Sequence, residues 1–341
     1  MDRIALIGAG SLGTIAGALI AEQSRDIELI DTNQPHVEAM NTHGVRITGA
    51  LDRTIPVVAK LPEQLDGTYD LVILLTKQTA IEAALDRVTP HLTSDSVVCA
   101  LQNGTPEDKV ASLVGADRTI VGNVQYSAVW EEPGVSRLAT TLEETRAHSF
   151  DIGELDGTTT DRLLHIADIL SAVGDCWISH NITGMKWSKL VINSTFSGLS
   201  AALGCRFGTI ANDPDLMKIA LNVADETIRT GWAHGLTIDD IDNHPIESFT
   251  TDGWTEEQRT AFFVDKISKH SHAEASMLQD LRKHIPTERD FINGRVIEVA
   301  EHHNLDAPLN RELYRLISQA EDTNTLPNFE HSKRALLDLS K

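Results

Sequence analysis

A glycine-rich hexapeptide near the N-terminus constrains the fold of this chain more than any other stretch. A short apolar run, Arg3 to Ile7, is followed by Gly8-Ala9-Gly10-Ser11-Leu12-Gly13, by a small-residue helix over Thr14 to Glu22, and by a second apolar run, Ile27 to Ile30, that ends at Asp31. The order strand, glycine turn, helix, strand and acid is typical of a dinucleotide-binding βαβ unit. This stretch therefore predicts a doubly wound α/β sheet of the Rossmann type.

Each glycine of the turn has a separate physical task. Gly8 permits the tight turn, Gly10 leaves bare backbone for a pyrophosphate, and Gly13 lets the helix pack close to the strand. The start of the helix, directly after Ser11, Leu12 and Gly13, then binds the anion through its free N–H groups and its dipole. These five positions are the predicted contacts of a dinucleotide phosphate.

A purely structural glycine turn is the alternative, because such turns are common. Asp31 argues against it, since it lies eighteen residues after Gly13 at the end of the second strand. A carboxylate at that place can accept both hydroxyls of an adenosine ribose. We therefore predict that the chain binds a nicotinamide dinucleotide.

The overall charge of the chain limits its partners. Its 341 residues include 29 lysines and arginines against 50 aspartates and glutamates, a formal net charge of −21. Such a surface repels nucleic acid and anionic lipid, so we expect neither a nucleic-acid nor a membrane partner. It also repels a dinucleotide or a carboxylate substrate, so a site for either must be built from local cations.

The sequence carries no sign of export or of a metal centre. No apolar run reaches the length of a membrane span, and no basic segment followed by an apolar core stands at the N-terminus. Cys99, Cys176 and Cys205 are scattered and have no paired spacing, so neither disulfides nor a metal site are predicted. We therefore expect a cytoplasmic protein.

Two further apolar runs place polar residues at one edge of the predicted sheet. Asp70 to Thr76 has the pattern of a strand buried on both faces and ends at Lys77, and Ser96 to Leu101 is a second such strand that leads into Gln102-Asn103-Gly104. Ligands of open parallel sheets bind beyond the carboxyl ends of the strands, so Lys77 and Asn103 are expected on the same rim as the glycine turn and Asp31. The alternatives are a solvated strand end for Lys77 and a plain turn at Asn103.

The pattern of the chain changes near residue 180. Before it, we expect helices over residues 34–43, 80–89 and 160–172, and strands over residues 45–48, 119–129, 134–138, 146–152 and 176–178. After it, the pattern predicts long helices over residues 185–203, 215–234, 255–281 and 288–304, interrupted by Pro214, Pro245 and Pro286. The predicted architecture is a dinucleotide-binding domain over residues 1–180 and an all-helical domain for substrate and catalysis over residues 181–341.

The first helix of the second domain carries a polar stripe. Lys189, Asn193 and Ser197 are spaced at i, i+4 and i+8, and at about 3.6 residues per turn their side chains lie along one side, flanked by the apolar Leu190 and Val191. One interpretation is an exposed face with ordinary surface residues. The other is a catalytic face, on which a lysine that is protonated at neutral pH donates a proton to a carbonyl oxygen while the asparagine orients that oxygen or the lysine.

Six segments spread over nearly the full length form a recognisable set. They are Gly8 to Gly13, Thr76-Lys77, Gln102-Asn103-Gly104, Trp187-Ser188-Lys189 with Asn193, and a late pair, Ser276 to Asp280 followed by Thr287 to Gly294. With these segments the chain resembles the ketopantoate reductase family, two-domain nicotinamide-dependent 2-oxo-acid reductases that include some D-2-hydroxyacid dehydrogenases. The late pair is the specific part, because other β-hydroxyacid dehydrogenases share the glycine turn and the lysine–asparagine spacing but not these segments.

The resemblance implies a role for each matched residue. It implies that Lys189 is the general acid with Asn193 as its partner, that Ser276 contacts the substrate carboxylate, that Lys77 contacts the cofactor, that Asn103 lies near the nicotinamide end and the substrate, and that Glu288 binds the nicotinamide ribose or the substrate hydroxyl. The cofactor set is completed by Gly8, Gly10, Ser11, Leu12, Gly13 and Asp31, and the substrate set by Ser197.

Three positions depart from the family pattern. Asp31 stands where NADPH-using members carry an arginine, and a carboxylate there would repel a 2′-phosphate, so we expect NAD(H) to be preferred over NADP(H). Ser197 replaces a second asparagine on the catalytic helix, and Ala273 replaces a further substrate-binding asparagine. The loss of two amides leaves the redox chemistry in place but puts ketopantoate itself in doubt as the substrate.

The combined expectation is an NAD(P)H-dependent reductase that converts a 2-oxo acid to the (R)-2-hydroxy acid. The substrate is either 2-dehydropantoate or a related branched or aromatic 2-oxo acid. A D-2-hydroxyacid dehydrogenase outside pantothenate synthesis is one alternative, and a sensor that holds NAD(H) without turnover is another. A sensor would have no use for a lysine acid together with its substrate-binding partners. The sequence leaves open whether the chain forms a homodimer.

Overall fold

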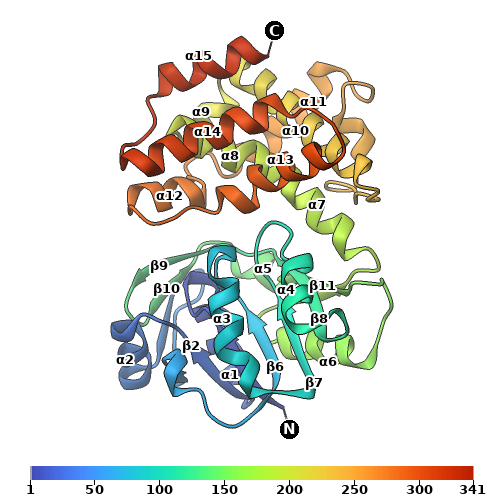
Figure 1. Ribbon diagram of the computed structural model, residues 1–341. Coiled ribbons are helices and arrows are strands. Elements are labelled where there is room, and N and C mark those ends of the chain that lie inside the picture. The colour runs from blue at the N-terminus through green and yellow to red at the C-terminus, as the bar shows by residue number, and fades with distance from the viewer. Residues whose placement is uncertain (1, 341) are drawn as a thin grey trace. The chain divides into compact units, whose positions relative to one another are not determined.

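The computed structural model describes residues 2–340 and divides into two compact units, with the boundary between Ile182 and Thr183. The first unit combines strands and helices, and the second is helical (Figure 1). The predicted fold class, a Rossmann-type sheet followed by a helical domain, is therefore confirmed.

The first unit is built on an eight-stranded sheet. Its strands are β1 (Arg3–Ile7), β2 (Asp26–Ile30), β5 (Val58–Lys60), β6 (Tyr69–Leu74), β7 (Leu92–Ala100), β8 (Thr119–Val124), β11 (Phe150–Glu154) and β12 (Cys176–Ile178). They lie in the order β12-β11-β8-β7-β6-β1-β2-β5, and only β8 and β11 pair antiparallel. The winding reverses at β1, and sheets of this kind bind their ligands at that switch point.

Helices cover this sheet, so its central strands are largely buried. They are α1 (Ser11–Glu22), α2 (Gln34–His43), α3 (Ile81–Val88), α4 (Glu107–Val114), α5 (Leu142–Ala147) and α6 (Asp161–Leu170), with 3₁₀ turns at Pro62–Gln64, Gln78–Ala80, Thr89–His91 and Ala116–Arg118. Helix α1 packs beside α6, and α3 packs beside α4. The side chains of β1 from Ile4 to Ile7 are buried, as a strand covered on both faces requires.

A second sheet of four strands packs against α1. It consists of β3 (Val45–Gly49), β4 (Arg53–Ile55), β9 (Ala128–Glu132) and β10 (Val135–Leu138), in the order β4-β3-β10-β9. The prediction of one strand over residues 119–129 is wrong, because β8 ends at Val124 and β9 belongs to this other sheet. The strand predicted over residues 146–152 is also wrong at its start. Thr141 caps α5, which extends to Ala147 before β11 begins.

The second unit is a bundle of helices around one apolar core. Its elements are α7 (Ile182–Ile192), a π turn (Asn193–Ser197), α8 (Gly198–Leu203), α9 (Phe207–Ala211), α10 (Pro214–Ala233), α11 (Glu256–Ser268), α12 (Ser276–Arg282), α13 (Asn293–His302), α14 (Pro308–Thr323) and α15 (Phe329–Leu339), with 3₁₀ turns at Ile246–Phe249 and Arg289–Phe291. Apart from an isolated bridge between Ile241 and His244, residues 183–340 form no strand.

Several helix boundaries in this unit differ from the prediction. The helix expected over residues 255–281 is two helices, because the intervening segment bonds to α9 through Phe207 N to Ala273 O at 3.1 Å and Gly208 N to Ser271 O at 2.9 Å. The helix expected over residues 288–304 begins as a 3₁₀ turn and becomes α-helical at Asn293. Helices α14 and α15 were not predicted. Pro214, expected just before the helix over residues 215–234, is itself the first residue of α10, since proline fits the first turn of a helix.

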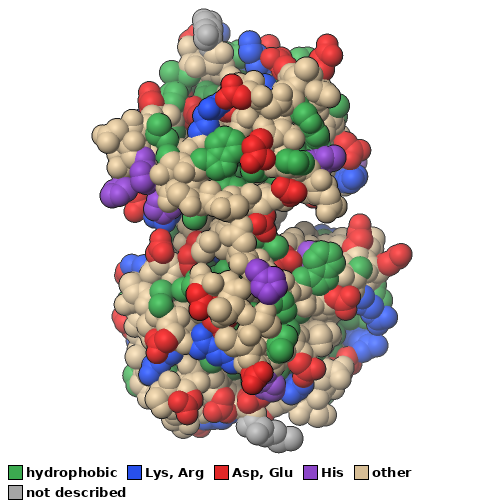
Figure 2. All heavy atoms as spheres, turned by 90° about the vertical axis from the view of Figure 1, so that its right-hand side faces the viewer, with side chains coloured by type: hydrophobic (Ala, Val, Ile, Leu, Met, Phe, Trp, Pro, Cys, Tyr) green, Lys and Arg blue, Asp and Glu red, His purple; other side chains and the backbone are tan. Residues whose placement is uncertain are grey.

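The surface of the described residues agrees with an acidic protein. Acidic side chains are scattered over both units on the face shown in Figure 2. Within residues 2–340, no helix combines the length and the apolar character that crossing a membrane would need.

Candidate functional site

The glycine turn joins β1 to α1, and its three glycines are constrained in three different ways. Gly8 has a φ of +95°, and a Cβ there would lie 2.5 Å from the Thr76 nitrogen. A Cβ on Gly13 would lie 2.1 Å from the Gly8 carbonyl oxygen, whereas within residues 2–340 no heavy atom beyond Gly10 and its two chain neighbours lies within 4 Å of the place that a Cβ on Gly10 would take. The fold therefore requires Gly8 and Gly13, and the bare backbone at Gly10 is accessible to a ligand.

The first turn of α1 presents backbone N–H groups beside Gly10. Gly10 is the N-cap residue and offers no side chain to accept from them, and the first backbone bond of the helix runs from Thr14 N to Gly10 O at 2.9 Å. The N–H groups of Ser11, Leu12 and Gly13 precede that bond, and such groups at a helix start bind phosphate. A pyrophosphate therefore fits this turn.

A buried histidine, His36, fixes the carbonyl group that precedes Gly10. His36 Nε2 lies 2.8 Å from Ala9 O, and His36 Nδ1 lies 2.8 Å from Gly134 N. Because the Gly134 N–H can only donate, Nδ1 accepts and Nε2 carries the hydrogen that the Ala9 carbonyl accepts. Thr14 Oγ1 donates to the same carbonyl at 2.6 Å. Sequence reasoning missed His36, since no local pattern ties α2 to the glycine turn.

The four predicted rim positions follow four neighbouring strands. Gly8 follows β1, Asp31 follows β2, and Lys77 and Asn103 come shortly after the ends of β6 and β7. These strands are adjacent and parallel in the order β7-β6-β1-β2, so all four positions lie at the carboxyl edge of the sheet. Lys77 and Asn103 are half-buried, and Gln78 Nε2 donates to the Asn103 carbonyl.

The Asp31 carboxylate is half-buried and has one oxygen engaged. Its Oδ1 accepts from the Asn33 N–H at 2.9 Å, in the turn that begins α2. Within residues 2–340 its Oδ2 has no hydrogen-bond donor, so that oxygen can accept from a ligand hydroxyl. A phosphate at the same place would instead face the negative charge of the carboxylate.

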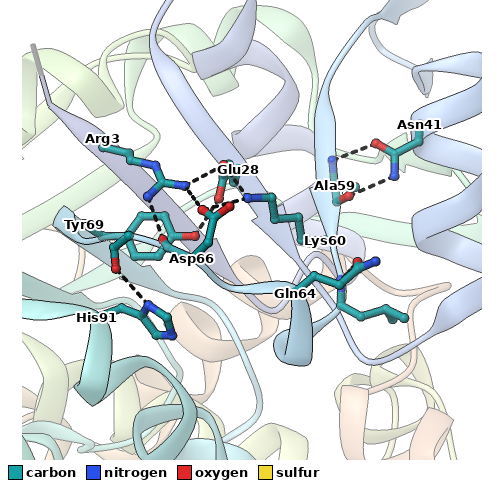
Figure 3. Close-up of polar contacts among 11 residues, drawn as sticks. Arg3, Glu28, Asn41, Ala59, Lys60, Gln64, Asp66, Tyr69 and His91 are labelled. Atoms are coloured by element: carbon teal, nitrogen blue, oxygen red, sulfur yellow. Dashed lines mark hydrogen bonds and ion pairs between the residues drawn. The ribbon is translucent and has the colours of Figure 1, made fainter.

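The same sheet also carries a cluster of charged residues with one tyrosine, which we call the charged cluster and which consists of Arg3, Glu28, Lys60, Asp66 and Tyr69. Glu28 of β2 accepts from Arg3 at 3.0 Å, Lys60 at 2.8 Å and the Tyr69 hydroxyl at 2.5 Å, and Arg3 also pairs with Asp66 (Figure 3). Burial alone would raise the pKa of Glu28, but these hydrogen bonds outweigh it and hold that pKa below its usual value. Arg3 and Tyr69 are the first residues of β1 and β6, Glu28 is the middle residue of β2 and Lys60 is the last residue of β5, so this cluster ties four strands of the sheet together.

In the second unit, α7 and the π turn that follows it carry the predicted catalytic stripe. Trp187 is buried and anchors the helix, because its Nε1 donates to Thr227 O of α10 at 3.0 Å. Lys189, Asn193 and Ser197 are each half-buried, while most residues around them are buried. The accessible face of this segment is therefore the one that carries the three polar side chains.

The stripe does not continue in α-helical geometry, contrary to the prediction. Residues Asn193–Ser197 form a π turn, in which Gly198 N donates to the Asn193 carbonyl five residues earlier. In an α-helix four residues pass a full turn by about 40°, whereas in a π turn, whose bonds span five residues, four residues fall short of it. The α-helical step from Lys189 to Asn193 therefore turns slightly too far around the helix axis, and the π-helical step from Asn193 to Ser197 turns slightly too little. The two deviations cancel, so the three residues share one face.

Asn293 of α13 replaces the hydrogen bond that the π turn removes. In an α-helix Gly198 N would bond to Ser194 O, but here it bonds to Asn193 O. The Ser194 carbonyl instead accepts from Asn293 Nδ2 at 2.9 Å. A Cβ on Gly198 would lie 2.8 Å from Asn293 Oδ1, so glycine at this position leaves room for the amide.

The Asn293 amide is held in turn by residues of two further helices. Asn293 Nδ2 also donates to Asn310 Oδ1 of α14 at 2.9 Å, and Asn310 Nδ2 donates to Glu226 Oε2 of α10 at 2.9 Å. Glu226 accepts the backbone N–H groups of Leu309 and Asn310 at 3.0 Å each. Burial raises the pKa of Glu226, and these donors offset only part of the effect. We call Ser194, Asn293, Asn310 and Glu226 the amide network.

The π turn has an energetic cost. Two buried polar atoms beside it, Thr195 Oγ1 and Asn293 Oδ1, have no hydrogen-bond partner within residues 2–340. An unpaired buried polar group costs about 1–3 kcal/mol. Natural proteins accept such local costs mainly at functional sites. Sequence reasoning missed Asn293, Asn310 and Glu226 as supports of this site, although Asn293 belongs to one of the segments that carry the family resemblance.

Ser276 and Glu288 lie on segments that pack near the π turn. Ser276 is the exposed first residue of α12, a helix that packs against α8 and the π turn. The preceding residue fixes the start of α12, because Ala275 N donates to Ser200 Oγ of α8 at 3.2 Å. Glu288 is buried and lies five residues before Asn293, whose amide reaches the π turn.

Both neighbours of Glu288 bind one carboxylate of α14. Thr287 Oγ1 donates to Glu321 Oε2 at 2.7 Å, and Arg289 Nη1 lies 2.5 Å from the same oxygen. Burial raises the pKa of Glu321, but these hydrogen bonds outweigh it and leave that pKa below its usual value. The Glu288 backbone is therefore held on both sides, as a site residue requires.

These features define a two-domain protein of the dinucleotide-binding class, with an open glycine turn at the switch point of its first unit. Its sequence matches the family described as ketopantoate reductase PanE/ApbA over residues 4–152, and the C-terminal domain of that family over residues 181–321. The chain belongs to the ketopantoate reductase family, which confirms the predicted resemblance.

Named relatives and solved structures agree with this assignment. The 2-dehydropantoate 2-reductase of Pyrococcus horikoshii is 30% identical over 94% of this chain and 97% of its own length, and that of Streptococcus pyogenes is 26% identical over 93% and 97%. The structure of 2-dehydropantoate 2-reductase from Geobacter metallireducens aligns with a TM-score of 0.80 at 25% identity, covering 93% of this chain and 99% of that one. D-mandelate dehydrogenase with NADH and anilino(oxo)acetate aligns with a TM-score of 0.81 at 23% identity, covering 94% and 99%, and so shares the fold.

Proposed function

We propose that this protein reduces a 2-oxo acid to the (R)-2-hydroxy acid with NADH. The observation that carries the proposal is the glycine turn, in which two glycines are required by the fold and the third is open to a ligand. Relatives that align over nearly the whole chain are named 2-dehydropantoate 2-reductase, which supports the substrate class. When bound, the reduced nicotinamide supplies a hydride for the carbonyl carbon.

The residues of this chain supply the proton and the orientation of the substrate. Lys189 is the general acid, whose ammonium donates a proton to the carbonyl oxygen as the C–O double bond is reduced. Asn193, one helical turn further on, orients that oxygen or the lysine. The Ser276 hydroxyl binds the substrate carboxylate, and Glu288 accepts the substrate hydroxyl or a hydroxyl of the nicotinamide ribose. The half-buried positions of Lys189 and Asn193 support these roles.

The proposed cofactor contacts lie at the carboxyl edge of the sheet. The N–H groups of Ser11, Leu12 and Gly13 bind the pyrophosphate beside Gly10, in the turn that begins with Gly8. Asp31 accepts the adenosine ribose hydroxyls, and Lys77 and Asn103 contact the cofactor toward its nicotinamide end. The position of these residues after four adjacent parallel strands supports this set.

The preference for NADH over NADPH follows from the single accessible oxygen of Asp31 and its charge. Asp31→Arg should raise the ratio of kcat/KM with NADPH to that with NADH by about tenfold or more. The repulsion between the Asp31 carboxylate and the 2′-phosphate is then replaced by attraction to a guanidinium, and a change of about 1.4 kcal/mol corresponds to a factor of ten. Asp31→Asn serves as the control that removes the charge alone. A wild-type enzyme that already prefers NADPH would contradict the assignment.

The expected substrates are narrowed by positions 197 and 273, where this chain lacks two asparagines of the family pattern. Ser197 and Ala273 leave fewer donors and acceptors for the terminal hydroxyl of ketopantoate, and burying that hydroxyl without a partner would cost about 1–3 kcal/mol. We therefore propose that unhydroxylated branched or aromatic 2-oxo acids, such as 2-ketoisovalerate or phenylpyruvate, are reduced at least as well as ketopantoate. The chain would then act as a D-2-hydroxyacid dehydrogenase outside pantothenate synthesis.

A scan of 2-oxo acids with NADH and with NADPH tests the proposed function. The loss of reduced cofactor is followed by absorbance, and kcat/KM is compared across ketopantoate, 2-ketoisovalerate and phenylpyruvate. A preference of about a hundredfold for ketopantoate would overturn the substrate proposal and leave 2-dehydropantoate reduction. Tight NADH binding without turnover of any 2-oxo acid would instead identify a sensor.

The assembly and location of the protein are part of the same proposal. A structural relative from Staphylococcus aureus is described as a dimeric ketopantoate reductase, and on that ground we propose a homodimer, to be measured by sedimentation. We also propose a location in the cytoplasm, because the scattered positions of Cys99, Cys176 and Cys205 have no paired spacing, which suits a reducing compartment.

A further inference from the structure

The π turn, and not the helix on either side of it, carries the two polar side chains that follow Lys189. Asn193 is the first residue of the turn and Ser197 is the last. The direction of each side chain is therefore set by how the turn is held. In this unit the turn is held by a side chain from another helix, because Asn293 Nδ2 binds the Ser194 carbonyl inside it at 2.9 Å.

We propose that Asn293 is a positioning residue that fixes the directions of Asn193 and Ser197 and so determines how the 2-oxo acid is recognised. This inference rests on the proposed function and adds to it a residue that does not touch the substrate. Asn293 acts through the turn, and Asn310 and Glu226 hold Asn293 in place from behind.

Three observations favour this role over that of an ordinary buried polar cluster. The Ser194 carbonyl needs a donor from outside the helix only because the π turn exists. A Cβ on Gly198 would lie 2.8 Å from Asn293 Oδ1, so the glycine leaves the space that the Asn293 amide needs to reach the Ser194 carbonyl. Thr195 Oγ1 and Asn293 Oδ1 are buried without partners within residues 2–340, so the arrangement is not the one that satisfies the most hydrogen bonds.

Asn293 also joins the turn to the segment that carries Glu288. The Ile292 N–H donates to the Glu288 carbonyl at 3.1 Å, and Asn293 follows directly as the first residue of α13. A shift of Asn293 would therefore be felt at Asn193, at Ser197 and at Glu288 together. Small displacements of positioned groups reduce turnover by as much as about 10²-fold.

Two substitutions test the proposal from opposite sides of the contact. Asn293→Ala removes the donor of the Ser194 carbonyl. Gly198→Ala keeps every side chain of the network but adds a Cβ that displaces the Asn293 amide, and it is expected to fold because alanine forms helices better than glycine. Asn328→Ala is the matched control in the same unit, since the Asn328 side chain holds a backbone N–H at the start of α15, outside the network.

The kinetic result separates positioning from general destabilisation. In Asn293→Ala and Gly198→Ala we expect kcat/KM for the 2-oxo acid to fall by about tenfold or more, with the Kd for NADH within about twofold of wild type. In Asn328→Ala both constants should stay within about twofold, although one helix cap is lost. Wild-type kcat/KM in a folded Asn293→Ala or Gly198→Ala variant would overturn the proposal.

Hydrogen exchange provides a readout that does not depend on turnover. Amides in the peptide covering residues 190–200 should exchange faster in both test variants than in wild type, and at the wild-type rate in Asn328→Ala. Unchanged exchange in both test variants would overturn the proposal. If the wild type reduces no 2-oxo acid, the proposed function fails, and the exchange rates alone decide whether Asn293 holds the turn.

Discussion

The two units expose functional backbone by opposite means. In the first, Gly10 simply lacks a side chain, and the backbone beside it is open to a ligand. In the second, the backbone of the π turn loses an internal hydrogen bond, and Asn293 supplies a replacement from a helix about a hundred residues away in sequence. The open backbone at Gly10 follows from the local sequence, whereas the arrangement of the π turn includes a tertiary contact that forms only in the folded unit.

The same contrast separates two glutamates, the buried Glu28 and the half-buried Glu226. Glu28 is surrounded by Arg3, Lys60 and Tyr69, which hold its pKa below the usual value in spite of its burial. Glu226 is surrounded by neutral amide donors, and burial raises its pKa in spite of them. The charged cluster therefore gains from ionisation, while the amide network accepts it at a cost.

The largest expected effect comes from the residue that acts in the chemistry. Lys189→Ala should lower kcat by roughly 10² to 10⁴, the range that general acids supply, with the Kd for NADH nearly unchanged. Steady-state kinetics and a fluorescence titration with NADH measure the two constants. If more than half of the wild-type kcat remains, another group delivers the proton.

A substitution at Gly10 sharpens the contrast between the two kinds of glycine. Gly10→Ala should leave the melting temperature within a few degrees of wild type, because among the described residues only the chain neighbours of Gly10 lie within 4 Å of the added Cβ. It should weaken NADH binding by about tenfold or more, because the Cβ takes the space of the pyrophosphate. Gly13→Ala is the comparison that should fail to fold, with a Cβ 2.1 Å from a carbonyl oxygen. Wild-type affinity in Gly10→Ala would show that the phosphate binds elsewhere.

The smallest expected effect is on the pH dependence of the free energy of unfolding, to which Glu28 and Glu226 should contribute with opposite signs. The lowered pKa of Glu28 means that its ionisation stabilises the fold above its unfolded pKa of about 4.3, and that this contribution is lost as the pH falls through the folded pKa. The raised pKa of Glu226 has the opposite sign, since its contribution is full below the unfolded pKa and is lost as the pH rises through the folded pKa.

Urea unfolding of Glu28→Gln and Glu226→Gln near pH 4 and near pH 7 measures the difference. The destabilisation by Glu28→Gln should grow with rising pH, and that by Glu226→Gln should shrink. Parallel pH profiles for the two variants would show that the contrast between the charged cluster and the amide network is not an electrostatic one.

Local patterns predicted the first unit well. The glycine turn, the apolar runs that became β1, β2 and β6, and the acid at Asp31 are each encoded within a few residues, and parallel-sheet topology then brought the predicted rim positions to one edge. Errors arose where strands left the main sheet. Nothing in residues 119–129 marks that β8 and β9 belong to different sheets, because both are apolar and extended.

The second unit shows the limit of such reasoning. The spacing of Lys189, Asn193 and Ser197 predicted a shared face, but a regular helix would have carried the three residues progressively around the axis. The π turn that keeps them together accepts a hydrogen bond from Asn293, and no pattern within residues 185–203 predicts either the turn or this contact. Similarly, the break between α11 and α12 depends on hydrogen bonds to α9.

The π turn also has a consequence for how sequences of this kind can vary. It accommodates one residue more than an α-helix would, so a single deletion within residues 193–198 would return the segment to α-helical geometry, whereas in a regular helix it would rotate everything beyond it by about 100°. Leu199 and Leu203, which are buried beyond the turn, would then keep their places in the core, and only the turn itself would change. Side chains such as Ser197 can also be exchanged without moving these core residues. Substrate range in this helix can therefore change by substitution or by loss of the extra residue, while the core beyond the turn is preserved.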